Sequence, residues 1–428
     1  MRRLSARSRE LLLMSLLAIT SSGVAPAVVM AQRGATPVSR ADAVESAVTR
    51  GTRLGIARAD TAAAFANLLT ARSFENPSFS ADYSKSTPRY HFSLDLPIDY
   101  PWMRRLRVSA AESGRQAAQY TFAFERAAAA LDADTTYTRA LAARAHARLS
   151  RQNAQDADSL LHMAVARRDA GDASELDVEL ATVNAGQQDN IAVADSLEFL
   201  SAVLDLQAVM GIATPGIAIT PMDSLGAPPD AGDGGAASGV LAARDSTAGA
   251  PLPVAAAMET LRGATLSSQL EHRSVFLLPG INVGFETGDP TGSEPGILPT
   301  VGLSLPLPLF NRNRGPIAQA EAERARAEAE LTLARIEANT ELTRARRQLE
   351  IARGKVARDR TLAEAAERVA RMSLTAYREG ESTLPSVMEA QRNTRDVLAA
   401  YVDDLAAAWI ASADLRVLLL TPATAIHP

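Results

Sequence analysis

The sequence predicts a mainly α-helical protein with a membrane β-barrel, built as a tandem repeat of a strand pair followed by long coiled-coil helices. Three observations predict this class. Apolar residues make up 47% of the 428 residues but aromatic residues only 4%, which favours long helices packed through small side chains. The two halves of the sequence match at a constant offset. Each half also contains two segments in which apolar and polar residues alternate.

The internal repeat has an ungapped offset of 209 residues. Leu94 and Leu303 begin the same Leu-x-Leu-Pro pattern, and Gly171 and Gly380 lie at equivalent positions near the other end of each copy. Eight further identical pairs share this offset: Glu112 and Glu321, Arg115 and Arg324, Arg144 and Arg353, Arg151 and Arg360, Met163 and Met372, Val178 and Val387, Ala181 and Ala390, Asn184 and Asn393. Because all these matches share one ungapped offset, they indicate a tandem duplication.

The N-terminus predicts export. Four arginines precede an apolar stretch from Leu11 to Ile19, and small residues follow up to Ala31, which is the order of a secretory signal peptide. An uncleaved membrane anchor is the alternative, but the apolar run is well short of the roughly 20 residues that span a bilayer as a helix. We expect no later transmembrane helix, so any membrane-embedded part has to consist of strands.

Strand pairs are expected in both copies because apolar residues recur at every second position, as in Tyr90, Phe92 and Leu94. The four predicted strands cover residues 76–85, 89–98, 280–289 and 298–307. Each has about ten residues, the length of a tilted membrane-spanning strand. Four strands cannot close a barrel, so several chains have to pool them. Two chains would give a filled barrel of eight strands and three would give twelve with room for water.

Long helices follow the strand pairs, and shorter helices at residues 40–70 and 254–272 precede them. Between Pro316 and Tyr377 there is no proline, so one helix of about 60 residues can extend about 90 Å. Small residues recur along it in steps of four and three, the heptad of a left-handed supercoil. This seam comprises Ala338, Leu342, Ala345, Leu349, Ala352, Val356, Asp359, Ala363, Ala366, Ala370, Ser373 and Tyr377. The first copy has an equivalent, still smaller seam from Ala129 to Arg168.

A glycine, Gly171 or Gly380, ends each long helix because glycine readily adopts the left-handed conformation of a helix C-terminus. Returning helices are expected to about residues 210 and 420. The expected N-cap pairs are Ser174 with Asp177 and Thr383 with Ser386. The chain then divides into a signal peptide at 1–31, a first repeat at 32–210, a linker at 211–252, a second repeat at 253–420 and a tail at 421–428.

Several function classes are disfavoured by composition. The formal net charge is −5, so nothing favours binding to a nucleic-acid backbone. The chain has no cysteine, and its five histidines form no His-Glu-x-x-His pattern, so we expect no cofactor, no metal site and no enzymatic activity.

These features resemble the TolC-like outer-membrane efflux proteins, also called outer-membrane factors. The resemblance covers nearly the whole mature chain. It rests on the repeated strand pair and long helix, on the segment 305–315 (LPLPLFNRNRG) and on the tip sequence Tyr-Arg-Glu-Gly that ends at Gly380. The Pro-Leu-Phe-Asn-Arg-Asn element is similar to the heavy-metal branch associated with resistance-nodulation-division pumps.

The resemblance implies a homotrimer with a twelve-stranded barrel in outer-membrane lipid, joined to an α-helical tunnel in the periplasm. The chain would be the exit duct of a tripartite efflux system, with a periplasmic adaptor and an inner-membrane pump as partners and heavy-metal cations as candidate cargo. The linker would wrap the tunnel or be disordered. The rival interpretations are a periplasmic coiled-coil adaptor protein, which would have a single hairpin, and a secreted hydrolase.

The resemblance also suggests site residues at the tips. The expected adaptor contacts are Asp169, Gly171, Asp172, Glu379, Gly380 and Glu381. The expected tip gate comprises Asp177, Tyr377, Ser386 and Glu389. Tyr377 matches a tip tyrosine and Asp177 its acidic partner, whereas Ser382 stands where a partner arginine would be expected. Glu389 would face the lumen, or alternatively pair with Arg392 or Arg395.

Overall fold

The computed structural model describes residues 36–86, 88–212, 218–228, 249–275, 279–287, 296–304 and 311–425. The predicted signal peptide, most of the predicted linker and the first part of the segment 305–315 lie outside the described residues.

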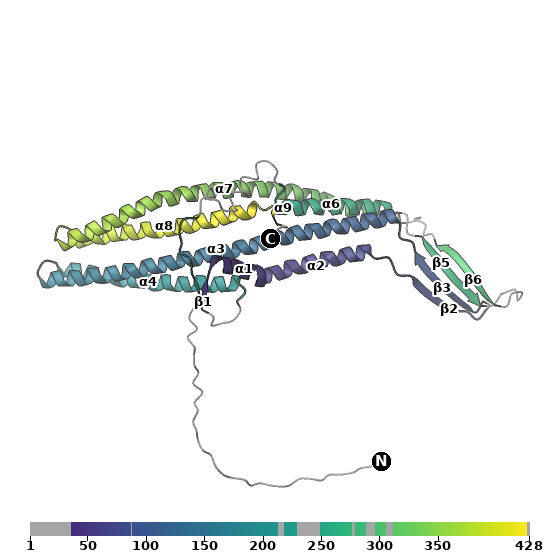
Figure 1. Cartoon of the computed structure of the whole chain (residues 1–428), viewed down its shortest axis with the longest axis horizontal. Helices are drawn as coiled ribbons and strands as arrows, with labels where there is room; N and C mark the ends of the chain where they lie inside the picture. The colour runs from purple at the N-terminus through teal and green to yellow at the C-terminus, as the bar shows by residue number, and fades with distance from the viewer. Residues whose placement is uncertain are drawn as a thin grey trace, which may run out of the picture.

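Two long helices form the axis of an elongated molecule (Figure 1). α3 (Pro101–Asp169) has 69 residues and α7 (Arg314–Arg378) has 65, so each extends about 100 Å. α4 (Glu175–Val209) packs back along α3, and α8 (Leu384–Leu418) packs back along α7. The result is two helical hairpins whose turns lie at the same end of the molecule (Figure 1).

Shorter helices complete the half of the molecule that lies nearer the sheet. α1 (Arg40–Arg50) and α2 (Thr52–Arg72) pack against α3, and α6 (Leu252–Arg273) lies between α3 and α7 (Figure 1). The prediction of one helix over residues 40–70 was wrong, because Gly51 has an extended backbone (ψ 127°) and ends α1 before α2 begins. A four-residue helix, α9 (Pro422–Ala425), follows the end of α8.

The helices form a single layer with a defined lateral order. Near the tips the order is α4, α3, α8, α7, since α8 packs against α3 as well as α7. Nearer the sheet the order is α2, α3, α6, α7. In both halves, the two border helices of the layer pack along one side only within the described part of the chain. None of the helices in the described part of the chain combines the length and apolar character that a membrane crossing requires.

The buried residues of α3 and α7 follow the predicted small-residue seams. Ala133, Ala140, Ala147 and Ala164 are buried in α3 and Ala345, Leu349, Ala352, Val356 and Ala363 in α7. Other seam positions are only half-buried, among them Ala154 and Leu161 in α3 and Ala338 and Ala370 in α7, and Leu160 is buried next to Leu161. Small side chains at these sites let the helix axes approach closely over most of their length.

The strands form one antiparallel sheet with the order β2-β3-β5-β6. They are β2 (Ser78–Tyr83), β3 (Tyr90–Pro97), β5 (Gly280–Thr287) and β6 (Ile297–Ser304). The sequence predicted the two pairs separately, and the structure joins them through β3 and β5. β2 and β6 have no neighbour on their outer sides in the described part of the chain.

The register of the sheet separates apolar and polar side chains. Phe79 faces Leu94, Leu94 faces Val283, and Val283 faces Val301, so one face is apolar across all four strands. Rings add to this face, where Phe92 and Phe285 stack with centroids 4.8 Å apart. The opposite face carries polar residues including Ser80, Asp82, His91, Ser93, Asp95, Asn282, Glu286 and Thr300.

A short parallel strand pair lies at mid-length of the helices. β1 (Thr36–Val38) pairs with β4 (Ile219–Pro221), and both pack near the α3/α4 hairpin. The sequence predicted no regular structure in the linker that contains β4. A three-residue strand is too short to show periodicity, and its partner lies about 180 residues away along the chain.

Candidate functional site

Each hairpin tip ends in the same backbone arrangement. Gly171 and Gly380 have positive φ angles of 85° and 79°. The amide of the following residue, Asp172 or Glu381, donates to a carbonyl five residues earlier, at Arg167 or Ala376, over 2.8 Å. Glycine suits these positions because left-handed backbone is strained for other residues.

Acidic side chains surround both tip glycines and are exposed: Asp169, Asp172, Glu379 and Glu381. Of these four, Asp169 accepts a hydrogen bond from Arg168 Nη2 over 2.8 Å. The Arg168 guanidinium also lies 3.5 Å from Glu175, and the bond to Asp169 is the main reason that the pKa of Arg168 is raised. The carboxylates of Asp172, Glu379 and Glu381 form no ion pair within the described part of the chain.

The start of α4 is capped as predicted. The Ser174 amide and hydroxyl donate to the Asp177 carboxylate over 3.0 and 2.9 Å, and the Asp177 amide donates back to Ser174 Oγ over 3.2 Å. This is a capping box with an aspartate in the third helical position. Asp177 is therefore engaged by Ser174, and no hydrogen bond joins it to Tyr377 within the described part of the chain.

The start of α8 differs from the prediction. Thr383 is the N-cap residue by position, but its side chain makes no capping bond. The Ser386 hydroxyl donates to the Thr383 carbonyl over 2.8 Å and lies beside the Ser382 hydroxyl. The prediction of an N-cap pair at Thr383 and Ser386 is therefore wrong. Pro385 lies in the first turn of α8 and has no amide hydrogen, so one fewer amide there needs a capping acceptor.

An arginine of the first hairpin reaches the second hairpin at the tip. Arg167 Nη1 donates to the Tyr377 carbonyl oxygen over 2.8 Å, and its guanidinium lies 4.7 Å from the centroid of the Tyr377 ring. The same side chain lies 3.4 Å from the Asp172 carbonyl oxygen. Arg167 thus supplies a cationic contact to Tyr377 from the other hairpin.

Tyr377 is the most enclosed of the predicted gate residues. Its side chain is 3% exposed and packs in a cluster with Leu160, Val178, Leu384 and Val387. Its hydroxyl has no hydrogen-bond partner among the described residues, and burial raises the pKa of this phenol. The tip is therefore held by apolar packing and by Arg167, which no sequence motif indicated.

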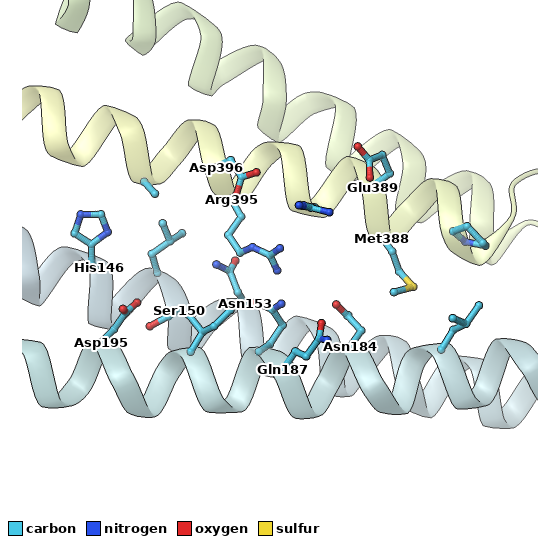
Figure 2. A pocket seen from close by; sticks show the side chains of 17 residues that line it. His146, Ser150, Asn153, Asn184, Gln187, Asp195, Met388, Glu389, Arg395 and Asp396 are labelled. Carbon is cyan, nitrogen blue, oxygen red and sulfur yellow. The ribbon is translucent and has the colours of Figure 1, made fainter.

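Glu389 lies beside a polar groove between the two hairpins (Figure 2). The groove has a volume of about 670 Å³ and is lined by α3, α4 and α8, with amides such as Asn153 and Asn184 on its walls. Glu389 is exposed, and no ion pair joins it to Arg392 or Arg395 in the described part of the chain. The alternative pairing expected from the sequence is therefore not formed.

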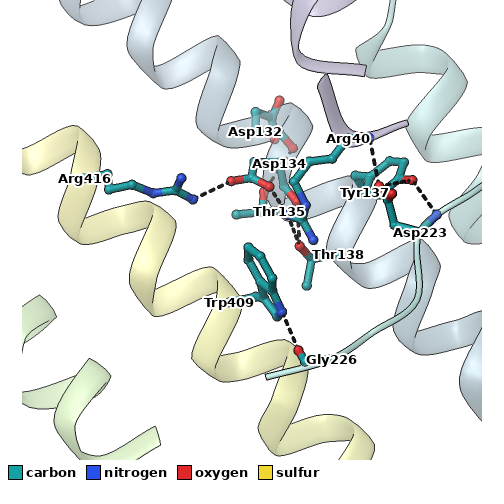
Figure 3. A network of polar contacts seen from close by, with 10 residues as sticks. All are labelled: Arg40, Asp132, Asp134, Thr135, Tyr137, Thr138, Asp223, Gly226, Trp409 and Arg416. Carbon is teal, nitrogen blue, oxygen red and sulfur yellow. Dashed lines mark hydrogen bonds and ion pairs between the residues drawn. The ribbon is translucent and has the colours of Figure 1, made fainter. Parts of the chain in front are cut away.

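A second polar network fixes the middle of the molecule (Figure 3). Asp134 of α3 accepts from Arg40 at the start of α1 and, over 3.0 Å, from Arg416 of α8. The Arg40 guanidinium lies over the rings of Trp409 and Tyr137, at 4.2 and 5.3 Å. This network joins the N-terminal segment to both hairpins.

The described part of the linker is tied to the same network. Asp223 lies 2.8 Å from the Tyr137 hydroxyl, and Trp409 Nε1 donates to the Gly226 carbonyl over 2.7 Å (Figure 3). Burial is the main cause that raises the pKa of Tyr137 to about 12. Among the described residues, no group of three or more His, Asp or Glu side chains is placed to hold a metal ion.

Comparison with known proteins relates this arrangement to a family. Residues 285–419 match the family of outer membrane efflux proteins. The cobalt-zinc-cadmium resistance protein CzcC of Cupriavidus metallidurans is 24% identical over 379 residues, which cover 87% of this chain and 88% of CzcC.

Solved structures show the same fold. The CmeC outer membrane channel of Campylobacter jejuni superposes with a TM-score of 0.72 at 16% identity, covering 89% of this chain and 85% of CmeC. The outer membrane protein VceC of Vibrio cholerae superposes with a TM-score of 0.70 at 17% identity, covering 89% and 95%. Residues 285–419 thus match the outer membrane efflux proteins, and 89% of the chain shares its fold with these two outer-membrane proteins.

Proposed function

We propose that three copies of this chain form a channel through the outer membrane that continues as a helical tunnel into the periplasm. The channel would be the exit duct of a tripartite efflux system. The observation that carries this proposal is the four-stranded sheet, which has one apolar face and, among the described residues, two open edges at β2 and β6.

The sheet requires further copies of the chain. Large side chains of its apolar face are exposed, and Val301 reaches 80%. An apolar face suits a lipid environment, but lipid tolerates no unpaired sheet edge, so the sheet has to close on itself. Pairing β2 of one copy with β6 of the next satisfies both edges. Two copies would close a barrel of eight strands filled by side chains, whereas three copies would close a barrel of twelve strands with a water-filled lumen.

The helical layer supports the same assembly. α4 and α7 form its borders near the tips, and both expose large apolar residues. On α4 these are Leu176, Leu180, Val183, Ile191, Val193, Leu197, Leu200 and Leu204, and on α7 Leu333, Ile336, Ile351, Leu362, Val369 and Met372. Contact between α4 of one copy and α7 of the next buries both faces. Because α7 runs towards the tips and α4 runs back from them, this contact also keeps neighbouring helices antiparallel around a closed ring.

The tips are the proposed contact for a periplasmic adaptor. They lie at the opposite end of the molecule from the sheet, which would place them deep in the periplasm (Figure 1). Exposed Asp172, Glu379 and Glu381 make this surface acidic, so it suits an adaptor hairpin that presents arginines. The adaptor would connect the channel to an inner-membrane pump of the resistance-nodulation-division type.

Heavy-metal cations are the proposed cargo. The relative CzcC is named for resistance to cobalt, zinc and cadmium. Removal of residues 1–31 would take away four arginines and one glutamate, so the mature chain would carry a net charge of −8. We place Glu389 in the lumen, where threefold symmetry would bring three carboxylates together near the closed tip and favour passage of cations.

Membrane fractionation and sizing in detergent test this proposal. The mature chain is expected in the outer-membrane fraction and, after extraction, at the mass of three copies. A periplasmic adaptor protein, the alternative function, would remain with the inner membrane or in the periplasm. A monomeric mature chain that needs no detergent would overturn the channel.

A further inference from the structure

A group of aromatic and basic side chains lies where the sheet meets the helices, and the proposed channel does not account for it. We call this group the junction, and it comprises Phe74, Tyr100, Trp102, Arg104 and Arg105. Phe74 follows the end of α2, and the other four residues lie at the beginning of α3. The junction thus borders the end of the sheet that lies nearer the helices (Figure 1).

The rings of the junction are exposed although they are large. Tyr100 and Trp102 stack with centroids 4.6 Å apart and an interplanar angle of 15°. Trp102 is 54% exposed and Phe74 is 67% exposed. The Arg104 guanidinium covers one side of Phe74, at 4.3 Å from the ring centroid. Exposed rings beside charged groups are typical of the boundary between an apolar phase and water.

Positive charge exceeds negative charge at this point of the chain. Asp99 is shared by Arg107, at 2.6 Å, and Arg104, at 3.8 Å. Arg104 also donates to the Arg72 carbonyl over 2.6 Å, but its Nε atom is buried and forms no hydrogen bond with the described residues. Arg105 is exposed and forms no ion pair in the described part of the chain. Two arginines therefore share the Asp99 carboxylate, and Arg105 adds a third positive charge at the start of α3.

Trp102 and Arg105 share one side of α3, because they lie three residues apart on the helix. An indole ring and an unpaired guanidinium at this spacing can contact the same molecule. The guanidinium fork matches a phosphate, and the indole ring favours the adjoining region between headgroups and acyl chains.

The dimensions of the sheet place the junction at a bilayer surface. Strands β3, β5 and β6 have eight residues each, so the sheet extends about 26 Å, close to the height of the apolar band of an outer-membrane barrel. At the far end of the sheet, the rings of Tyr83 and Tyr90 lie 5.3 Å apart. The apolar face is thus bounded by aromatic residues at both ends.

We propose that the junction binds the phosphate-bearing headgroups of phospholipids in the periplasmic leaflet, with a preference for anionic lipids. This inference rests on the proposed function, because headgroups reach the junction only when the sheet lies in the bilayer. The junction is an open surface of rings and guanidinium groups, so a phosphate that carries acyl chains suits it better than free phosphate.

The two tryptophans of the chain allow a direct test. Trp409→Phe leaves Trp102 as the single tryptophan of the chain. Trp102→Phe keeps Trp409 and gives the fluorescence of a tryptophan outside the junction. Each full-length mature trimer is reconstituted into phosphatidylcholine vesicles that contain a brominated phospholipid, which quenches a nearby indole. The measurement compares quenching by brominated phosphatidylglycerol with quenching by brominated phosphatidylcholine.

We expect Trp102 to be quenched more strongly by the anionic lipid, with an apparent preference of about fivefold. Arg104→Gln with Arg105→Gln, made in the Trp409→Phe background, should reduce this preference towards one. The matched control makes the same change at two exposed arginines of α7, Arg335 and Arg344, and should leave the preference for the anionic lipid unchanged.

Three results would overturn the inference. The first is that neither brominated lipid quenches Trp102. The second is that the preference for the anionic lipid persists in the Arg104 and Arg105 variant. The third is that inorganic phosphate abolishes this preference, which would indicate a site for free phosphate. Conductance of the same reconstituted protein separates this inference from the proposed function. A conducting channel with an unquenched Trp102 refutes only lipid binding, whereas a protein that does not conduct refutes the channel itself.

Discussion

Arg167 and Tyr377 connect the two helical hairpins at their tips. The guanidinium donates a hydrogen bond of 2.8 Å to the Tyr377 carbonyl and lies over the tyrosine ring. Although the two residues are 210 positions apart in the sequence, the side-by-side arrangement of the hairpins brings them into contact. We infer that this contact keeps the second hairpin close to the first in the closed state.

Arg167→Ala is therefore expected to loosen the tip. A hydrogen bond from a charged donor contributes about 1.5–3 kcal/mol, and stacking on the ring adds about 0.5–2 kcal/mol. We expect higher conductance in planar bilayers and a lower free energy of unfolding. Arg168→Ala is the matched control, because Arg168 pairs within its own hairpin. Equal conductance of the Arg167→Ala variant and the wild type would show that the contact does not restrain the tip.

Reversing the tip charges should weaken docking of the adaptor. The change replaces all four acidic flanks, Asp169, Asp172, Glu379 and Glu381, with lysine. Arginines on an adaptor hairpin would then meet like charges, which is costly at an interface. In vivo cross-linking between channel and adaptor is expected to fall strongly while the trimer persists. Undiminished cross-linking would mean that these carboxylates are only solvated helix ends.

Glu389→Gln should alter ion selectivity without altering stability. Glu389 is exposed and forms no ion pair in the described residues, so its neutralisation removes no contact within the chain. In a closed trimer, three such carboxylates would repel one another and attract cations. Single-channel recordings are expected to show lower preference for cations and weaker block by divalent ions. Unchanged selectivity together with a lower melting temperature would instead place Glu389 in a helix contact.

Asp134→Ala tests the network at mid-length. Its carboxylate is 11% exposed and accepts from both Arg40 and Arg416, so its loss leaves two guanidinium groups without their partner. Removing one member of a buried ionic group typically costs about 3–5 kcal/mol. The exposed pair Arg326 and Glu330 provides the control, and Glu330→Ala should cost at most about 0.5 kcal/mol. Denaturant unfolding of the trimer in detergent measures both, and equal values would contradict a structural role for Asp134.

Features set by local sequence were predicted well. The glycine turns follow from the need for positive φ at Gly171 and Gly380, and the Ser174 cap follows from the spacing to Asp177. The seams follow from heptad repeats of small residues, because those positions face the partner helix in both copies.

Features set by contacts between distant segments were not predicted. Arg167 is one of many arginines on a helix, and the tertiary fold alone places it against Tyr377. β4 pairs with a strand about 180 residues away, and Arg40 meets Asp134 and Trp409 through the packing of three helices. The break at Gly51 was missed because a single glycine within a helical pattern is often tolerated.

Cysteine cross-linking tests the trimeric ring most directly. Val183 on α4 and Val369 on α7 are 58% and 49% exposed and lie at similar heights above the tip glycines, so a threefold axis along the helices would bring them together between copies. The chain has no cysteine of its own, so Val183→Cys with Val369→Cys gives a single defined pair.

On oxidation in membranes, the double variant should give covalent dimers and trimers and nothing larger, while each single variant stays monomeric on denaturing gels. A double variant that stays monomeric, stops at dimers or extends to longer ladders would contradict a closed ring of three.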